Sequence, residues 1–167
     1  MVSRFVSLVV VASLLSVGSA AAQSVRLLGD FRDWSSYAAS DGAGPVCFAM
    51  TKPTTVTPTP DGYTQAYLYL TSRPGENVAS EFNLVAGFTF QPDSGATVTV
   101  NGQTFNLFTQ NDAAWLDDAG QSDALASAIR AGSSLVVEGT TSAGIKVAQT
   151  FSLAGSTAAT QAVAAEC

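Results

Sequence analysis

Short β-prone segments separated by turn residues recur along most of this chain, and they restrict its possible folds more than any other feature. The clearest pair is residues 96–100 and 104–108, which flank Asn101-Gly102. Both central residues of the favoured two-residue hairpin turn have positive φ, which Asn and Gly tolerate. Strands that alternate strictly with full helices, as a parallel sheet requires, are absent, so the pattern predicts antiparallel pairing.

Several other segments have the same composition and are bounded by turn residues. We predict strands at residues 34–38, 46–50, 65–71, 78–85, 88–90, 134–138 and 146–153. Residues 51–62 contain three prolines, which lack the N–H that pairing within a sheet requires. This segment is therefore predicted to form an extended surface loop or a sheet edge.

One helix is predicted to begin at its cap, Ser122, and to end at Gly132. Leu125 and Ile129 lie on one face of this helix, and a helix this short needs tertiary packing, so both side chains are predicted to be buried. A second short helix is predicted at residues 157–166. The predicted fold class is mainly β, an antiparallel β-sandwich with one or two short helices.

The amino terminus has the three-part layout of an export signal. Arg4 supplies a positive charge, residues 5–17 are apolar or small, and residues 20–22 are alanines that offer a cleavage site. The apolar run is shorter than the roughly 20 residues that a membrane-spanning helix needs. We expect residues 1–22 to be removed as a signal peptide in preference to being retained as an anchor. Residues 23–167 would then form one exported domain without a transmembrane segment, periplasmic or secreted.

The charge of the exported part argues against two classes of partner. Removal of Arg4 leaves six basic against thirteen acidic residues, a net charge of about −7, with no basic cluster. An acidic surface of this kind repels the phosphates of nucleic acids and the headgroups of anionic lipids. We therefore expect no nucleic-acid binding.

The chain contains no histidine, which removes His-dependent hydrolysis and His-ligated metal sites. No glycine-rich phosphate-binding motif is present either. We expect no enzymatic activity, no cofactor and no bound metal. Two alternatives stay open at the acidic residues Asp112, Asp117, Asp118 and Asp123: a carboxylate-based glycan hydrolase, and a calcium site that includes Asn111. Both are weighed against a solvated acidic turn.

Cys47 and Cys167 are the two cysteines. In an oxidising compartment an even count is most simply interpreted as one bridge. Such a bridge would close a loop of about 120 residues, which the chain-entropy model values at roughly 4 to 5 kcal/mol. Two free thiols or an intermolecular bridge are the alternatives.

Two groups of aromatic residues have different predicted roles. Trp34 and Trp115 stand beside small apolar neighbours and are predicted to be core or corner residues. Tyr67 and Tyr69 alternate with leucines, and with Tyr63 they lie next to the proline-rich segment. Exposed tyrosines beside a rigid loop suit protein recognition, so these three are a possible interaction surface. The alternative is that this face packs beneath a second sheet or the loop.

An ordered set of short motifs spans nearly all of residues 23–167. It comprises Asp33-Trp34, Tyr37, Val46-Cys47-Phe48, residues 71–81, Gly87-Phe88-Thr89-Phe90, Asn101-Gly102, Phe105, residues 107–109, Ala114-Trp115, residues 131–133, 139–142 and 151–155, and Cys167. The set resembles the invasion-associated locus B family of α-proteobacteria. The resemblance implies an exported immunoglobulin-like β-sandwich with a bridge between Cys47 and Cys167, and it brings no catalytic residue with it.

We therefore expect a non-enzymatic cell-envelope protein that acts as a protein-interaction module, a monomer or weak oligomer. Its partner would be an unidentified protein at the envelope or at a host surface, bound through a sandwich edge or through residues 51–63. The alternatives are a structural or stress-protective periplasmic protein without a dedicated ligand, and the glycan hydrolase.

Overall fold

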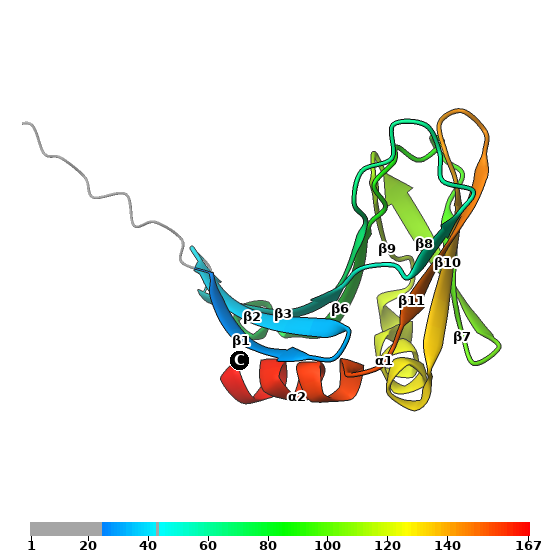
Figure 1. Ribbon diagram of the computed structural model, residues 1–167. Helices are drawn as coiled ribbons and strands as arrows, with labels where there is room; N and C mark the ends of the chain where they lie inside the picture. The colour runs from blue at the N-terminus through cyan, green and yellow to red at the C-terminus, as the bar shows by residue number, and fades with distance from the viewer. Residues whose placement is uncertain (1–24, 43) are drawn as a thin grey trace, which may run out of the picture.

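The structure is a computed structural model that describes residues 25–42 and 44–167. The predicted signal peptide, residues 1–22, lies outside the described residues. The strands are β1 (Arg26–Phe31), β2 (Trp34–Asp41), β3 (Gly44–Thr51), β4 (Thr55–Thr57), β5 (Tyr67–Arg73), β6 (Val78–Val85), β7 (Ala96–Val100), β8 (Gln103–Gln110), β9 (Ala113–Leu116), β10 (Ser134–Thr140) and β11 (Lys146–Ser152). Two helices, α1 (Ser122–Ala131) and α2 (Ser156–Glu166), and two 3-10 turns, η1 (Pro74–Glu76) and η2 (Ala119–Gln121), complete the described elements (Figure 1).

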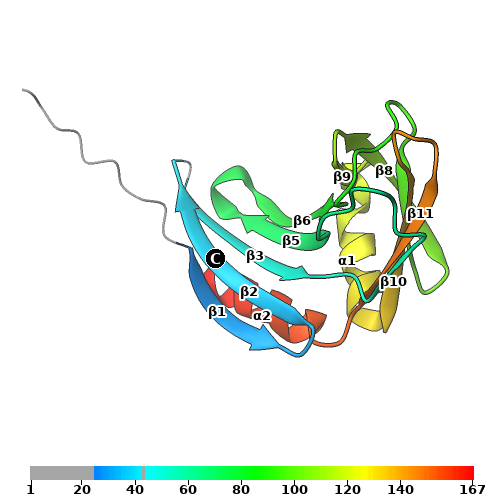
Figure 2. The same cartoon turned by 45° about the horizontal axis from the view of Figure 1, so that its top comes forward.

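All eleven strands form one antiparallel sheet in the order β1-β2-β3-β5-β6-β9-β8-β7-β10-β11-β4. Strand β4 follows β3 closely in the chain, yet it lies at the far end of the order beside β11. The sheet is therefore strongly bent, as Figures 1 and 2 show, but it is not closed. The predicted mainly β, antiparallel class with two helices is confirmed.

Two stacked sheets with an immunoglobulin-like topology are not shown. The reason is strand β9, which lies between aspartates that were predicted to form a solvated acidic turn. It pairs with β6 on one side and with β8 on the other, and so joins the two halves of the molecule into one sheet.

One face of the sheet carries the hydrophobic core. Strand periodicity places alternate side chains on this face, among them Trp34, Leu68 and Leu84. Helix α2 covers the core face over β1, β2 and β3 (Figure 1). Buried Ser36 on β2 donates a hydrogen bond to the carbonyl oxygen of Ala159 on α2, at 2.8 Å. Leu125 and Ile129 of α1 belong to the same core cluster, so both helices pack on this face of the sheet.

The predicted bridge is present between Cys47 and Cys167, with the two Cα atoms 6.0 Å apart. It joins β3 to the residue that follows α2, across a sequence separation of 120 residues. Cys47 is buried in the core. The alternatives of free thiols and of an intermolecular bridge are not what the structure shows.

The hairpin and the first helix match their predictions in most respects. Asn101 and Gly102 both have positive φ, at 49° and 76°, and they connect β7 to β8. Helix α1 ends at Gly132, and both Leu125 and Ile129 are buried. The predicted cap was wrong by one residue, because Ser122 is the first helical residue and the preceding glutamine takes the N-cap position without a side-chain hydrogen bond.

Two segments on either side of β5 differ in outcome. Within residues 51–62, strand β4 forms an edge of the sheet beside β11, so the prediction of an edge is confirmed. Residues 88–90 do not form a strand, because Phe90 makes only an isolated bridge with Thr141 and its N–H bonds to the carbonyl of Asn111 in a loop. In residues 25–42 and 44–167, neither helix is long and apolar enough to cross a bilayer.

Candidate functional site

The face of the sheet opposite both helices, the outer face, carries aromatic side chains from five strands. The register places Tyr37 opposite Phe48, Tyr69 opposite Asn83, and Asn83 opposite Trp115. Residues directly opposite each other in an antiparallel pair point to the same side. The resulting aromatic face consists of Tyr37, Phe48, Tyr67, Tyr69, Phe108 and Trp115.

Four of these rings are in contact with one another across β2, β3 and β5. The centroids of Tyr37 and Phe48 are 5.3 Å apart in a stacked arrangement, and Phe48 meets Tyr69 edge-on at 5.9 Å. Tyr67 lies 6.3 Å from Tyr69, and the ammonium of Lys52 sits 5.6 Å from the centroid of the Tyr67 ring. Offset and edge-on pairs of this kind fix the ring orientations. The cluster is therefore a preformed apolar surface with one cation at its border.

A second pair of rings lies on β8 and β9. Phe108 and Trp115 are stacked with their centroids 5.3 Å apart and their planes 18° from parallel. Phe108 is 46% exposed. Because Trp115 is its direct cross-strand partner, the two rings form one flat apolar platform.

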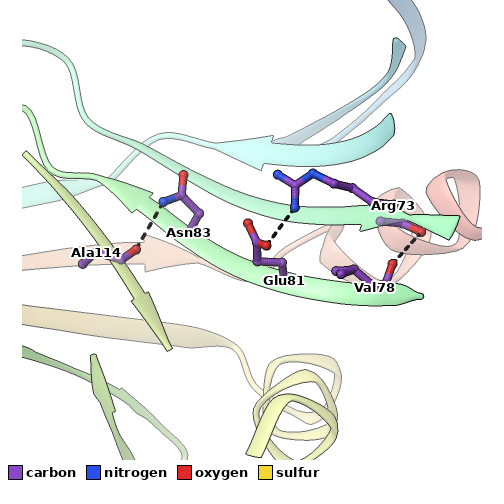
Figure 3. A network of polar contacts seen from close by, with 6 residues as sticks. Arg73, Val78, Glu81, Asn83 and Ala114 are labelled. Carbon is purple, nitrogen blue, oxygen red and sulfur yellow. Dashed lines mark hydrogen bonds and ion pairs between the residues drawn. The ribbon is translucent and has the colours of Figure 1, made fainter. Parts of the chain in front are cut away.

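Polar side chains separate the two groups of rings on β6. Asn83, opposite both Tyr69 and Trp115, donates its side-chain amide to the carbonyl oxygen of Ala114 at 3.3 Å (Figure 3). Figure 3 also shows Arg73 on β5 donating to the carboxylate of Glu81 on β6, at 2.7 Å. The outer face thus alternates apolar rings with oriented hydrogen-bonding groups, as protein-recognition surfaces do.

The ionisation of the site is simple. Partial burial, and secondarily the neighbouring Tyr67, raises the pKa of the Tyr69 phenol above its ordinary value of 10.0. Tyr69 is therefore neutral at physiological pH, and its hydroxyl is available to donate a hydrogen bond. Lys52, Arg73 and Glu81 supply the charges of this region.

The structure brings together two of the three tyrosines predicted as an interaction surface. Tyr67 and Tyr69 are half-buried on the outer face, in contact with rings that the sequence analysis did not include. Tyr63 lies on the loop before β5 and is in none of the ring pairs described above. Its hydroxyl accepts a hydrogen bond from the backbone N–H of Ala66 at 3.1 Å, and its ring packs against Gly87. Whether these tyrosines contact a partner stays a prediction.

The two tryptophans also have different outcomes. Trp34 is 1% exposed, and its indole N–H bonds to the carbonyl of Ser152 at 2.9 Å, so its predicted core role is confirmed. Trp115 is half-buried within strand β9 and belongs to the aromatic face, so its predicted role as a core or corner residue was wrong. The four residues of β9, Ala-Ala-Trp-Leu, do not alternate between small and large, so no local pattern marked this strand, and only its pairing with β6 and β8 defines it.

The acidic residues considered as catalytic or calcium-binding groups are spread over several elements. Asp112 lies in the turn between β8 and β9, Asp117 and Asp118 follow β9, and Asp123 lies in the first turn of α1. The carboxylate of Asp118 accepts the backbone N–H of Gly120 at 2.9 Å, which caps η2. Within the described ranges, no three His, Cys, Asp or Glu side chains gather as metal ligands would.

Comparison with known proteins gives one match. The family model described as Invasion associated locus B (IalB) protein matches residues 34–164. No curated protein and no solved structure matches the chain.

Proposed function

The chain belongs to the invasion-associated locus B family. From that premise we propose that it is an exported, non-enzymatic protein of the cell envelope. We propose further that it binds a partner protein through its aromatic face. Export to the periplasm or beyond is supported by the bridge between Cys47 and Cys167, since such bonds persist in oxidising compartments. The export signal predicted at residues 1–22 agrees with this location.

The observation that carries the proposal is the set of six aromatic rings on the sheet face that neither helix covers. Aromatic side chains dominate the binding energy of protein interfaces, because they remove a large area from water at a small cost in conformational entropy. A contiguous apolar patch on a protein surface marks an interaction site, whereas single exposed apolar residues are common. Phe108, at 46% exposed, has the most to gain from a partner that covers it.

The stacked arrangement also favours binding without large rearrangement. The rings of Tyr37, Phe48 and Tyr69 hold one another across neighbouring strands, so they lose little freedom when a partner arrives. A structural or stress-protective protein without a ligand would have no need of this arrangement, and no specific observation favours that alternative.

The test is crosslinking in living cells. A photo-reactive amino acid placed at Phe108 is expected to give a discrete crosslink to one protein, identified by mass spectrometry. The matched control replaces Gln161, an exposed residue of α2 on the opposite side of the sheet. The same crosslinking pattern from both positions, or none from Phe108 in a folded protein, would contradict the proposal.

A further inference from the structure

A groove of about 640 Å³ lies beside the aromatic face, where β6 extends beyond its neighbour β9. Residues 78–82 of β6 form one wall. Phe108, Trp115 and Leu116 contribute apolar side chains, and Ser122 and Asp123 at the start of α1 close the groove on the other side. The groove therefore continues the aromatic face past its stacked pair.

The wall formed by β6 is an unpaired strand edge. Strand β6 pairs with β5 from Val78 to Val85, whereas β9 pairs only with Asn83, Leu84 and Val85. Residues 78–82 thus have a strand on one side and the groove on the other. An edge of this kind exposes backbone N–H and C=O groups that another extended chain can pair with. Addition of a strand to a free edge is a common mode of peptide recognition.

The side chains that line the groove determine which residue types an added strand would carry at each position. Side chains of an added strand alternate between the two faces of the sheet, so every second residue would lie on the side of Trp115 and Phe108. The stacked pair is apolar and partly exposed, whereas Phe82 on the core side is buried and offers no surface to an added strand. Apolar residues at every second position of the added strand therefore have matching surface to cover.

The charge of the groove is negative. Its lining includes the carboxylates of Glu81 and Asp123, and no lysine or arginine among the residues that the structure describes. Glu81 already accepts a hydrogen bond from Arg73, whereas Asp123 takes part in neither of the two ion pairs of residues 25–42 and 44–167. The groove therefore attracts a cationic segment.

The same charges argue against a second copy of this chain as the occupant. Two copies pairing through residues 78–82 would bring Glu81 and Asp123 of both chains together, and each exported chain has a net charge of about −7. Like charges directly opposite one another in a sheet are destabilising.

From the free edge, the apolar lining and the carboxylates, we infer that this groove binds an extended segment of the partner protein, which adds to β6 as a further strand. The segment carries apolar residues at every second position and basic residues between them. The inference rests on the proposed function, because it names the part of the partner that the aromatic face would recognise. It specifies backbone pairing along residues 78–82 in addition to contacts with rings.

The experiment selects a displayed library of random peptides on the immobilised, oxidised protein. The selected peptides are expected to share alternating apolar residues with Lys or Arg between them. The strongest peptide, synthesised and added to the isotope-labelled protein, is expected to slow hydrogen exchange of those backbone amides of residues 78–82 that point away from β5, as followed by NMR. N-methylation of alternate peptide amides is expected to abolish binding, because it removes the hydrogen bonds to the strand edge.

Two variants test the role of charge. Asp123→Asn is expected to weaken peptide binding about two- to fivefold at low salt, the effect of one partly exposed charge pair. Asp61→Asn is the matched control, since Asp61 is exposed in the proline-rich segment away from the groove, and binding is expected to be unchanged.

Peptides without a shared pattern, acidic peptides, or protection that falls outside residues 78–82 would overturn the inference. A concentration-dependent dimer that protects the same amides without any peptide would overturn it in favour of a second copy. Crosslinks from Phe108 to a partner that persist when these peptide experiments fail would leave the proposed function standing and remove only this inference.

Discussion

Reduction of the bond between Cys47 and Cys167 is expected to lower the free energy of unfolding by up to about 5 kcal/mol. The magnitude follows from the sequence separation of 120 residues, because the bond removes the freedom of a loop of that length from the unfolded chain. A domain of this size has a total stability of about 5 to 15 kcal/mol, so the reduced protein is expected to be marginally stable.

The loss should begin at the end of the chain. Helix α2 is held on the sheet by the burial of Ala159 and Val163 and by the hydrogen bond from Ser36 to Ala159. The bridge anchors its last turn to β3. Without that anchor, amide exchange in α2 is expected to accelerate before exchange in the central strands does.

The assay is urea denaturation of the oxidised and the reduced protein, with intact mass and thiol alkylation to establish the redox state. The double variant Cys47→Ala, Cys167→Ala separates loss of the bond from any effect of the reductant. Its midpoint should match that of the reduced protein, apart from the small loss of packing at buried Cys47. Equal free energies of unfolding with and without reductant, or alkylation of both thiols before reduction, would refute the reasoning.

Three further perturbations test the packing and the ionisation of the fold. Gly155→Ala is expected to be strongly destabilising in thermal melts, because φ is +96° and the added Cβ would overlap the carbonyl oxygen of Phe31. Gly102 has φ of +76° but open space around the position of a Cβ, so Gly102→Ala should cost only about 1 to 2 kcal/mol of stability. Equal losses of stability in the two variants would contradict the geometry. Leu125→Ala should cost about 2 to 5 kcal/mol in urea titrations, because this side chain is 2% exposed, and a loss below about 1 kcal/mol would mean that α1 is not packed as described. Because the pKa of Tyr69 is raised in the folded protein, the unfolded chain loses the phenol proton first as pH rises. The contribution of this group to stability is therefore intact below pH 10 and falls at higher pH. Tyr69→Phe should reduce the loss of stability with rising pH in thermal melts, and an unchanged pH dependence would contradict burial of this phenol.

The local parts of the fold were predictable because their signals lie within a few residues. Asn101-Gly102 specifies a turn by its backbone preferences alone. The spacing of Leu125 and Ile129 places both on one face of α1, and Gly132 ends that helix. These features require no knowledge of what the helix or the hairpin packs against.

The arrangement of the sheet was not predictable in the same way. Strand β9 has only four residues and is flanked by aspartates, so its composition indicated a loop. Its strand conformation is fixed by pairing with β6 and β8, which are distant from each other in the chain. The sandwich was predicted from short strands bounded by turn residues, a pattern that does not distinguish two sheets from one sheet joined through β9.

The candidate site shows the same division. The alternation in β5 correctly placed Tyr67 and Tyr69 on one face, opposite the core. The register between strands, which the chain does not encode locally, adds Trp115 and Phe108 to that face. Tyr63 was grouped with the other tyrosines by its proximity in the chain, and a loop carries it elsewhere.

Oxidative footprinting tests the central claim, an open aromatic face that a partner covers, most directly. In the purified protein, hydroxyl radicals are expected to modify half-buried Trp115 and exposed Phe108 while Trp34, 1% exposed, stays unmodified. In intact cells, Trp115 and Phe108 are expected to become protected, while Ile145, which is 39% exposed between β10 and β11, is not. Equal reactivity of the two tryptophans would contradict the fold, and unchanged reactivity of Trp115 and Phe108 in cells would contradict the assignment of this face to a partner.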